Sequence, residues 1–401
     1  MNNIALYTLT SELHDAQAVS AATREFLDSL GIAFDCHEAD YTTYGSAPLS
    51  LIYVRTGGTE GIFRQLLPQL LEQSNQHTPI YLLTSGKSNS LAASMEILSF
   101  LRQQGLKGEV IHGEPAQISH RICVLEQVAL AIRELKGSRV GVIGKPSDWL
   151  ISSKADYTVV RQLTGIEIQD IPMQELLDTI KATPLEDTQL QSDEQHIKDA
   201  LPGAEQIYRA LKKLVAKYQL QALTIRCFDL LTAIHNTGCV ALARLNSEGI
   251  TAGCEGDVPT LLTMMFCRAI TGLSGFQANP AHINPENGEL LFAHCTIPFN
   301  MVECFELDTH FESGIGVGIR GNMKPGPVTI VKVSGNLGRH FIAEGRLQHS
   351  QCKPDLCRTQ QVISLDDVAQ VRYFLTDPIG NHHVIIPGRI REVMEELLKS
   401  F

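Results

Sequence analysis

The chain has 401 residues, of which 44% are hydrophobic and 19% charged, and its formal net charge at pH 7 is −11. This length predicts two to four domains with an ample core, and the negative charge argues against nucleic acid or an anionic membrane as the main partner. Ten cysteines in so long a chain do not make a disulfide framework. Residues 1–7 lack a basic region and no apolar run reaches about 18 residues, so we expect no signal peptide, no membrane span and a cytoplasmic protein.

Strand and helix alternate over the first third of the chain. Residues 4–8 are typical of a short apolar strand, residues 15–30 of an amphipathic helix, and residues 51–54 and 80–83 of buried strands. Such βα units predict a parallel sheet covered by helices, and we assign residues 1–137 to an N-terminal α/β domain.

The loop after residues 80–83 contains Ser85-Gly86-Lys87-Ser88, which resembles part of a phosphate-binding loop. The pattern G-x-x-x-x-G-K-[ST] also requires a glycine at position 81, where this chain has Tyr81. We therefore interpret the loop as a polar strand-to-helix turn, with a loop that faces a sugar or a partner as the alternative.

A second α/β unit follows, and we assign it residues 138–273. Within it, residues 139–144 are typical of a strand, residues 204–218 of an amphipathic helix, residues 222–229 of a strand that ends in an acid, and residues 240–245 of the start of a helix. The repeated βα pattern predicts a second parallel sheet.

The stretch from Thr251 to Cys295 is the most informative part of the sequence. It opens as a strand, a turn and a helix, with Asp257 as the predicted N-cap, Pro259 in the first turn and Gly272 at the end of the helix. Glu255 therefore follows the carboxyl end of a strand, which is where ligands bind in open α/β sheets. Because Asp257 already fills the capping position, Glu255 is available for chemistry.

Short, glycine-punctuated strands replace the βα pattern from about residue 276. Residues 314–319 and 327–333 are typical of antiparallel strands, and residues 388–398 of a short helix. We assign residues 274–401 to a β-rich, antiparallel, barrel-like C-terminal domain. The predicted fold class is thus α/β, with two parallel-sheet, Rossmann-like domains followed by a β-rich domain.

A divalent cation held by oxygen and imidazole needs carboxylate or carbonyl oxygens and one or two neutral histidines. Glu255, Asn279, His294 and His383 are candidates from separate regions, and the negative net charge suits such a site. Their spacing alone does not unite them, and a single histidine can equally be a satisfied structural residue.

Four segments together resemble the L-fucose isomerase and L-arabinose isomerase family: Glu255-Gly256-Asp257 at a helix start, residues 276–279, Ala293-His294, and Asn381-His382-His383. The resemblance implies an aldose–ketose isomerase in which a manganese-type ion binds the sugar's carbonyl and hydroxyl oxygens. Two acidic ligands would move a proton between neighbouring carbons through an ene-diol. It also implies a hexamer or similar homo-oligomer, with the site between the second and third domains.

One position departs from the family pattern. The second acid should fall at Ala278 or Asn279, and an asparagine can offer a carbonyl oxygen but cannot act as a base at neutral pH. Three explanations stay open. Glu255 works as the sole base with Asp229, Asp257 or His310 as partner; the reaction is a related one on a different sugar; or the protein is a non-catalytic or regulatory sugar-binding protein.

The resemblance and the residue types together give the expected site. Trp149, the sole tryptophan, could stack on a sugar or cover an edge of the core, and His310 could line the sugar pocket or bridge strands. We expect a small sugar as the substrate and Mn²⁺ as the cofactor. The expected catalytic residues are Glu255 and Asp257, the metal ligands are Glu255, Asn279, His294 and His383, and the substrate-binding residues are Trp149, His310 and His382.

Overall fold

The computed structural model describes residues 3–74 and 78–401, so Met1 and Asn2 of the N-terminal stretch lie outside the described residues. The chain forms two compact units, one that ends at Arg133 and one that runs from Glu134 to Lys399. Within the described ranges, no helix is both long enough and apolar enough to cross a lipid bilayer. The ten cysteines are free thiols.

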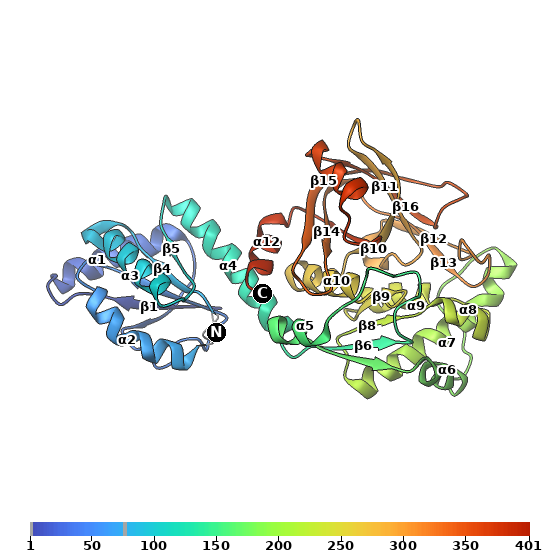
Figure 1. Ribbon diagram of the computed structural model, residues 1–401, viewed down its shortest axis with the longest axis horizontal. Coiled ribbons are helices and arrows are strands. Elements are labelled where there is room, and N and C mark those ends of the chain that lie inside the picture. The colour runs from blue at the N-terminus through green and yellow to red at the C-terminus, as the bar shows by residue number, and fades with distance from the viewer. Residues whose placement is uncertain (1–2, 75–77) are drawn as a thin grey trace. The chain divides into compact units, whose positions relative to one another are not determined.

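The first unit is a parallel sheet with a separate hydrophobic core on each face (Figure 1). Successive strand residues point to opposite faces, so Ile4 and Leu6 enter one core while Ala5 and Tyr7 enter the other. The predicted alternation of strand and helix is confirmed here. The elements are β1 (Ile4–Leu9), α1 (Ala16–Leu30), β2 (Asp35–Glu38), β3 (Leu49–Val54), α2 (Glu60–Gln73), β4 (Ile80–Leu83), η1 (Lys87–Asn89), α3 (Ser90–Gln103), β5 (Gly108–Ile111) and α4 (Pro115–Leu135).

The strand order in this sheet is β2-β1-β3-β4-β5. The loop after β4 is a polar turn in which Gly86 takes a left-handed conformation with φ 78° before α3 begins. Lys87 on this loop forms an ion pair of 3.0 Å with Glu25, and both side chains are largely exposed.

The second unit starts with a four-stranded parallel sheet covered by helices. Its hydrophobic core includes residues of the sheet, of helix α7 (Gln195–Tyr218) and of helix α9 (Cys239–Ser247). The elements are β6 (Arg139–Ile143), α5 (Tyr157–Thr164), β7 (Glu167–Ile171), α6 (Met173–Lys181), α7 (Gln195–Tyr218), β8 (Ala222–Ile225), α8 (Phe228–Ile234), α9 (Cys239–Ser247), β9 (Thr251–Cys254) and α10 (Val258–Thr271).

The strand order in this sheet is β7-β6-β8-β9. Two predicted boundaries were wrong. The strand expected over residues 222–229 ends at Ile225, and Asp229 lies in the first turn of α8, where a carboxylate is favourable near the helix N-terminus. The helix expected from residue 204 begins earlier, because Ile197 and Leu201 continue the buried face of α7 upstream.

The chain then forms a closed barrel of antiparallel strands, whose apolar core also includes buried residues of α7 and α9 (Figure 1). The elements are β10 (Phe276–Asn284), β11 (Glu289–His294), η2 (Phe299–Met301), β12 (Cys304–Asp308), β13 (Gly318–Asn322), β14 (Gly326–Val333), β15 (His340–Gln351), β16 (Thr359–Leu365), η3 (Val368–Gln370), α11 (Val371–Thr376), β17 (His383–Pro387) and α12 (Arg391–Lys399).

The barrel order is β10-β11-β16-β15-β14-β17, and β12 and β13 form a separate hairpin. The strand expected over residues 314–319 begins only at Gly318. The predicted fold class is confirmed, since two parallel sheets precede an antiparallel barrel. The predicted domain boundaries at residues 137 and 273 stay a prediction.

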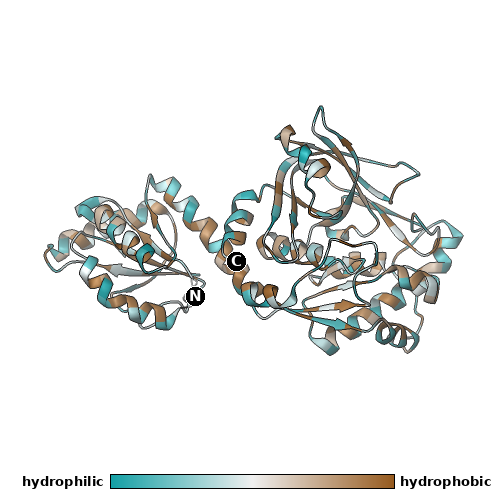
Figure 2. Cartoon of the chain, in the orientation of Figure 1, coloured by the Kyte–Doolittle hydropathy of each residue, from teal (hydrophilic) through white to brown (hydrophobic). Residues whose placement is uncertain are grey.

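Helix α10 is the element that joins the second sheet to the barrel. It packs against β9 of the sheet and against β14 and β17 of the barrel. All residues from Val258 to Cys267 are buried. Most other helices carry both hydrophobic and hydrophilic residues along their length (Figure 2). The first turn of α10 therefore lies where barrel strands can reach it.

Candidate active site

The turn between β9 and α10 is strained and firmly held. Glu255 has a left-handed φ of 64°, which is costly for a residue with a Cβ and is found mostly where surrounding structure enforces it. Its backbone oxygen accepts a hydrogen bond of 2.9 Å from Ser147 N. A Cβ on Gly256 would lie 2.4 Å from the backbone oxygen of Lys145, so only glycine fits there. The turn thus fixes the direction of the Glu255 side chain.

Three side chains from distant parts of the sequence meet at this turn. Glu255 follows β9, His294 ends β11 and His382 precedes β17, and one potential ligand atom from each lies within 4.8 Å of the others. Oε1 of Glu255 lies 3.3 Å from Nε2 of His382 and 3.7 Å from Nε2 of His294. All three residues are buried. The structure therefore supplies one carboxylate and two imidazoles to a single point.

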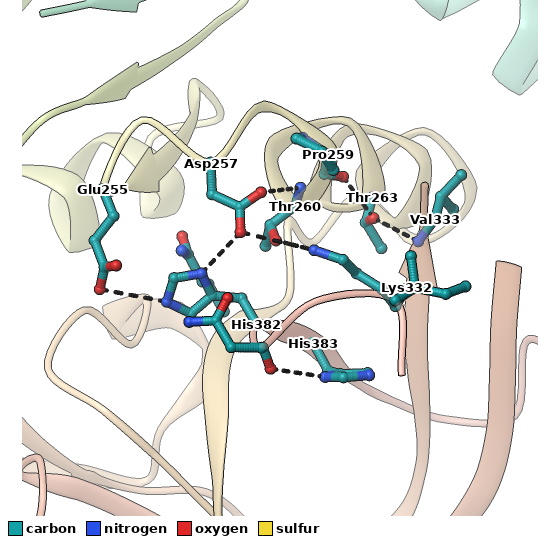
Figure 3. A network of polar contacts seen from close by, with 12 residues as sticks. Glu255, Asp257, Pro259, Thr260, Thr263, Lys332, Val333, His382 and His383 are labelled. Carbon is teal, nitrogen blue, oxygen red and sulfur yellow. Dashed lines mark hydrogen bonds and ion pairs between the residues drawn. The ribbon is translucent and has the colours of Figure 1, made fainter. Parts of the chain in front are cut away.

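Asp257 fixes the orientation of His382. Its Oδ1 accepts a hydrogen bond of 2.9 Å from Thr260 N and caps α10, as predicted, and its Oδ2 lies 2.8 Å from Nδ1 of His382 (Figure 3). Because an ionised carboxylate can only accept, the Nδ1 atom of His382 must carry the hydrogen. Among the described residues, Nε2 of His382 makes no well-formed hydrogen bond, although it is buried and lies 3.3 Å from Oε1 of Glu255.

The charges of this cluster are strongly coupled. Burial alone would raise the pKa of Glu255, but contact with His294 and His382 outweighs it and holds that pKa far below its usual range. Burial opposes the charged form of His382, yet Asp257 and Glu255 raise its pKa to about 9. Burial lowers the pKa of His294. His382 is therefore protonated at pH 7 in the metal-free site, and its positive charge pairs with the carboxylate of Glu255.

The residues present fit a divalent cation. Two imidazole nitrogens and a carboxylate oxygen are a common ligand set for such ions. Nε2 of His382 faces a carboxylate oxygen of Glu255 at 3.3 Å, and either a proton or a metal ion can bridge the two atoms. The pair of Asp257 and His382 also matches the carboxylate–histidine arrangement that orients metal ligands in proteins.

One of the expected metal ligands lies differently, and the contacts of a second leave its role a prediction. His383 points away from the cluster, with Nδ1 3.0 Å from Asn381 O and Nε2 3.0 Å from the Tyr373 hydroxyl, because neighbouring residues of an extended chain face opposite sides. Burial lowers the pKa of His383 to about 3. The oxygen of the Asn279 amide accepts a hydrogen bond of 3.0 Å from Asn381. Of the two adjacent histidines, the structure brings His382 to Glu255.

Aromatic residues line one side of the cluster. Trp149 donates a hydrogen bond of 2.6 Å from Nε1 to Oε2 of Glu255, while about half of its surface stays exposed. Its ring packs edge-on against Phe228 at 4.8 Å, and Phe228 packs edge-on against His310 at 5.4 Å. Burial lowers the pKa of His310 to about 4, so this ring is neutral at pH 7. Trp149 and His310 thus both lie near Glu255.

Several residues of this site had no specific sequence signal. Phe228 falls within the strand expected over residues 222–229, and Lys332 lies buried beside Asp257. Oε1 of Gln277 accepts a hydrogen bond of 2.8 Å from Cys254 N and so ties β9 to β10. Gln277 lies within residues 276–279, which carry the resemblance, and Lys332 is the one charged residue of the strand expected over residues 327–333.

No protein-family model matches the chain. Two curated proteins that are similar to it both carry the name sulfoquinovose isomerase. The protein from Alkalicoccus urumqiensis is 23% identical over 223 residues, which cover 52% of this chain and 49% of that protein. The protein from Clostridium sp. (strain MSTE9) is 23% identical over 255 residues, which cover 60% of this chain and 55% of that protein. The chain therefore matches about half the length of these curated relatives, and it shares weak homology with sugar isomerases.

Proposed function

We propose that this protein is a divalent-metal-dependent isomerase that interconverts an aldose and a ketose through an ene-diol. The observation that carries the proposal is the meeting of Glu255, His294 and His382 at one buried point beside a half-exposed tryptophan. The weak homology to sulfoquinovose isomerases supports the same reaction class. Mn²⁺ is the metal proposed, and a cytoplasmic homo-oligomer is proposed from the family resemblance.

Each residue has a distinct proposed role. A bound divalent ion would polarise the carbonyl oxygen of the sugar and stabilise the charge of the ene-diol. His294 and His382 would hold the ion through Nε2, and Glu255 through a carboxylate oxygen. Glu255, which its depressed pKa keeps ionised, would also take the proton from C2 of the aldose and return it to C1, while the hydroxyl proton on O2 passes to O1. Trp149 would fix that carboxylate through its N–H donor.

Asp257 would act by positioning rather than by contact with the sugar. The side chain is fully buried, and both of its oxygens accept hydrogen bonds from the protein. Trp149 and His310 would instead form the side of the pocket that faces the sugar, since ligand pockets are commonly lined by aromatic side chains.

The test starts from metal content and turnover of the purified protein. After removal of metal and reloading with Mn²⁺, we expect one ion per chain and ketose formation from at least one aldose in a panel that includes sulfoquinovose. Glu255→Gln should lower turnover by about a thousandfold or more, because the amide can neither bind the ion as a charge nor accept the proton. The change is nearly isosteric, so circular dichroism should show a folded protein.

The matched control is Glu286→Gln, which makes the same chemical change at an exposed residue between β10 and β11. Its turnover should equal that of the parent. Full activity of Glu255→Gln would remove Glu255 from the mechanism, and absence of turnover on every sugar despite bound metal would refute the isomerase.

A sugar-binding protein without catalysis is the second candidate. It is favoured by one observation, namely that Ala278 and Asn279 stand where the resemblance places a second acid. Saturable binding of a sugar that is never isomerised, with Mn²⁺ present, would support this candidate over the first.

A further inference from the structure

Lys332 is a buried lysine at the base of the candidate site. Its side chain is 1% exposed, and lysines are almost never fully buried unless they are paired. Nζ donates a hydrogen bond of 2.6 Å to Oγ1 of Thr260 and lies 3.7 Å from Oδ2 of Asp257. Taking an ammonium out of water is costly, so this pair needs an account beyond core packing.

The register of β14 holds the lysine in place. The next residue, Val333, donates a hydrogen bond of 3.1 Å from its backbone N to Oγ1 of Thr263, one turn further along α10 (Figure 3). On the strand, Lys332 shares a face with the buried Val328 and Ile330. The pairing of β14 with β15 and β17 fixes the register that delivers the ammonium to the start of α10, so loss of the Val333 hydrogen bond alone would not move Lys332.

Asp257 links the ammonium to the candidate metal ligand. Oδ1 accepts from Thr260 N, and Oδ2 lies 2.8 Å from His382 Nδ1 and 3.7 Å from Lys332 Nζ. Every neighbour is a donor, so this position needs two acceptor oxygens. If the group next to His382 were a donor, Nδ1 would have to accept, and Nε2 would carry the hydrogen and could not bind a metal.

We propose that Lys332 is a positioning residue, which acts through Asp257 to hold His382 with its Nε2 lone pair directed at Glu255 and His294. The proposal rests on the proposed metal site. The ammonium keeps Oδ2 of Asp257 on the His382 side, and the atom affected is Nε2 of His382, which lies 3.3 Å from Oε1 of Glu255. A purely structural Lys332 would affect stability alone.

The test measures metal binding of the full chain for Lys332→Met and Lys332→Gln. Both variants remove the charge, and the glutamine keeps a donor for Thr260 should the methionine variant fail to fold. We expect Mn²⁺ affinity to fall about 10–100-fold, the usual range for loss of a group that orients a metal ligand. The visible spectrum of the Co²⁺-loaded variants should also change, because an imidazole ligand is no longer held in place.

Asp257→Asn tests the contact that links Lys332 to His382. An amide has only one acceptor oxygen, so its NH₂ group would face either Thr260 N or Nδ1 of His382, both of which are donors here. This variant should lose at least as much affinity as the lysine variants. The matched control is Thr263→Val, which removes a hydrogen bond between the same helix and strand but contacts neither Asp257 nor His382. It should melt at a lower temperature and still bind Mn²⁺ within about twofold of the parent.

Two results would overturn the proposal: lysine variants with parental Mn²⁺ affinity and an unchanged Co²⁺ spectrum, or a Thr263→Val variant that loses as much affinity as they do. A parent protein without divalent-ion affinity would overturn it as well. Sugar turnover is not part of this test, so a metal-binding protein that isomerises nothing would refute the isomerase and leave the role of Lys332 standing.

Discussion

Two strand-to-helix turns of this chain make an instructive pair. The turn after β4 and the turn after β9 each follow a parallel strand, each contain left-handed residues, and each precede a helix. Around the first, Lys87 forms an exposed ion pair with Glu25. Around the second, Glu255 is buried beside His294 of β11 and His382 just before β17, and Lys332 of β14 lies beside Asp257.

The difference lies in what covers each turn. Charges interact far more strongly when water is excluded, so a carboxylate under barrel strands perturbs its neighbours in a way that an exposed pair does not. The pKa of His382 rises to about 9 and the pKa of Glu255 falls, whereas Lys87 and Glu25 form a largely solvated pair. The carboxyl end of a strand forms a candidate active site only when other elements place reactive side chains beside it.

The largest expected effect is on Mn²⁺ affinity and concerns the adjacent histidines His382 and His383, at the start of β17. His382→Gln should lower Mn²⁺ affinity more than about a hundredfold, because it removes a ligand rather than a group that orients one. His383→Gln should leave affinity within about tenfold and instead lower the melting temperature, because it breaks a buried contact with Tyr373. Calorimetric titration with Mn²⁺ and a thermal melt separate the two.

The reverse outcome, with affinity lost in His383→Gln and kept in His382→Gln, would restore the ligand assignment expected from the sequence. Tyr373→Phe serves as a control for His383, since it breaks the same hydrogen bond and leaves both histidines in place.

The glycines of the two turns give the next effect. Gly256→Ala should destabilise the second unit by about 3 kcal/mol, because φ is 70° and the new Cβ would meet backbone atoms of Lys145 and Pro146. Gly86→Ala has a similar φ of 78°, but its Cβ would meet the movable ring of His112, so a cost of about 1–2 kcal/mol is expected. Urea denaturation measures the free energy of unfolding of each variant. Equal losses would show that burial under barrel strands does not distinguish these turns.

Proton linkage sharpens the comparison further. Metal binding needs neutral His382, whose pKa of about 9 means that a proton competes at pH 7. Mn²⁺ affinity should therefore rise up to tenfold per pH unit between about pH 6.5 and 9, with close to one proton released. In the metal-free protein this raised pKa stabilises the fold fully below about pH 6.5 and loses that contribution as the pH rises through 9. Titrations in buffers of different ionisation enthalpy count the proton, and pH-independent affinity would contradict the coupling.

The smallest effect is expected at the exposed turn. Lys87→Met removes a solvated ion pair and should leave the denaturation midpoint unchanged within error, since exposed pairs contribute little. The same substitution at Lys332 is expected to change metal affinity. A clear loss of stability in Lys87→Met would mean that the first turn is less solvated than its exposure indicates.

Local pattern was sufficient for the fold class and for part of the site. Short apolar runs separated by helical segments predicted β1, β3 and β4. The sequence from Glu255 to Gly272 predicted a strand-to-helix turn, the Asp257 cap and the end of α10. These features depend on residues a few positions apart, whose spacing the sequence displays directly.

Tertiary structure alone decided which side chains meet. His382 and His383 are neighbours in sequence, and only the closed barrel determines which of them faces Glu255 and which faces Tyr373. Lys332 looks like an interruption of an apolar strand until the packing of β14 against α10 places it beside Asp257. Side-chain alternation sets the two faces of a strand, but which face is turned toward the site depends on contacts between residues more than a hundred positions apart, such as Asp257 and His382.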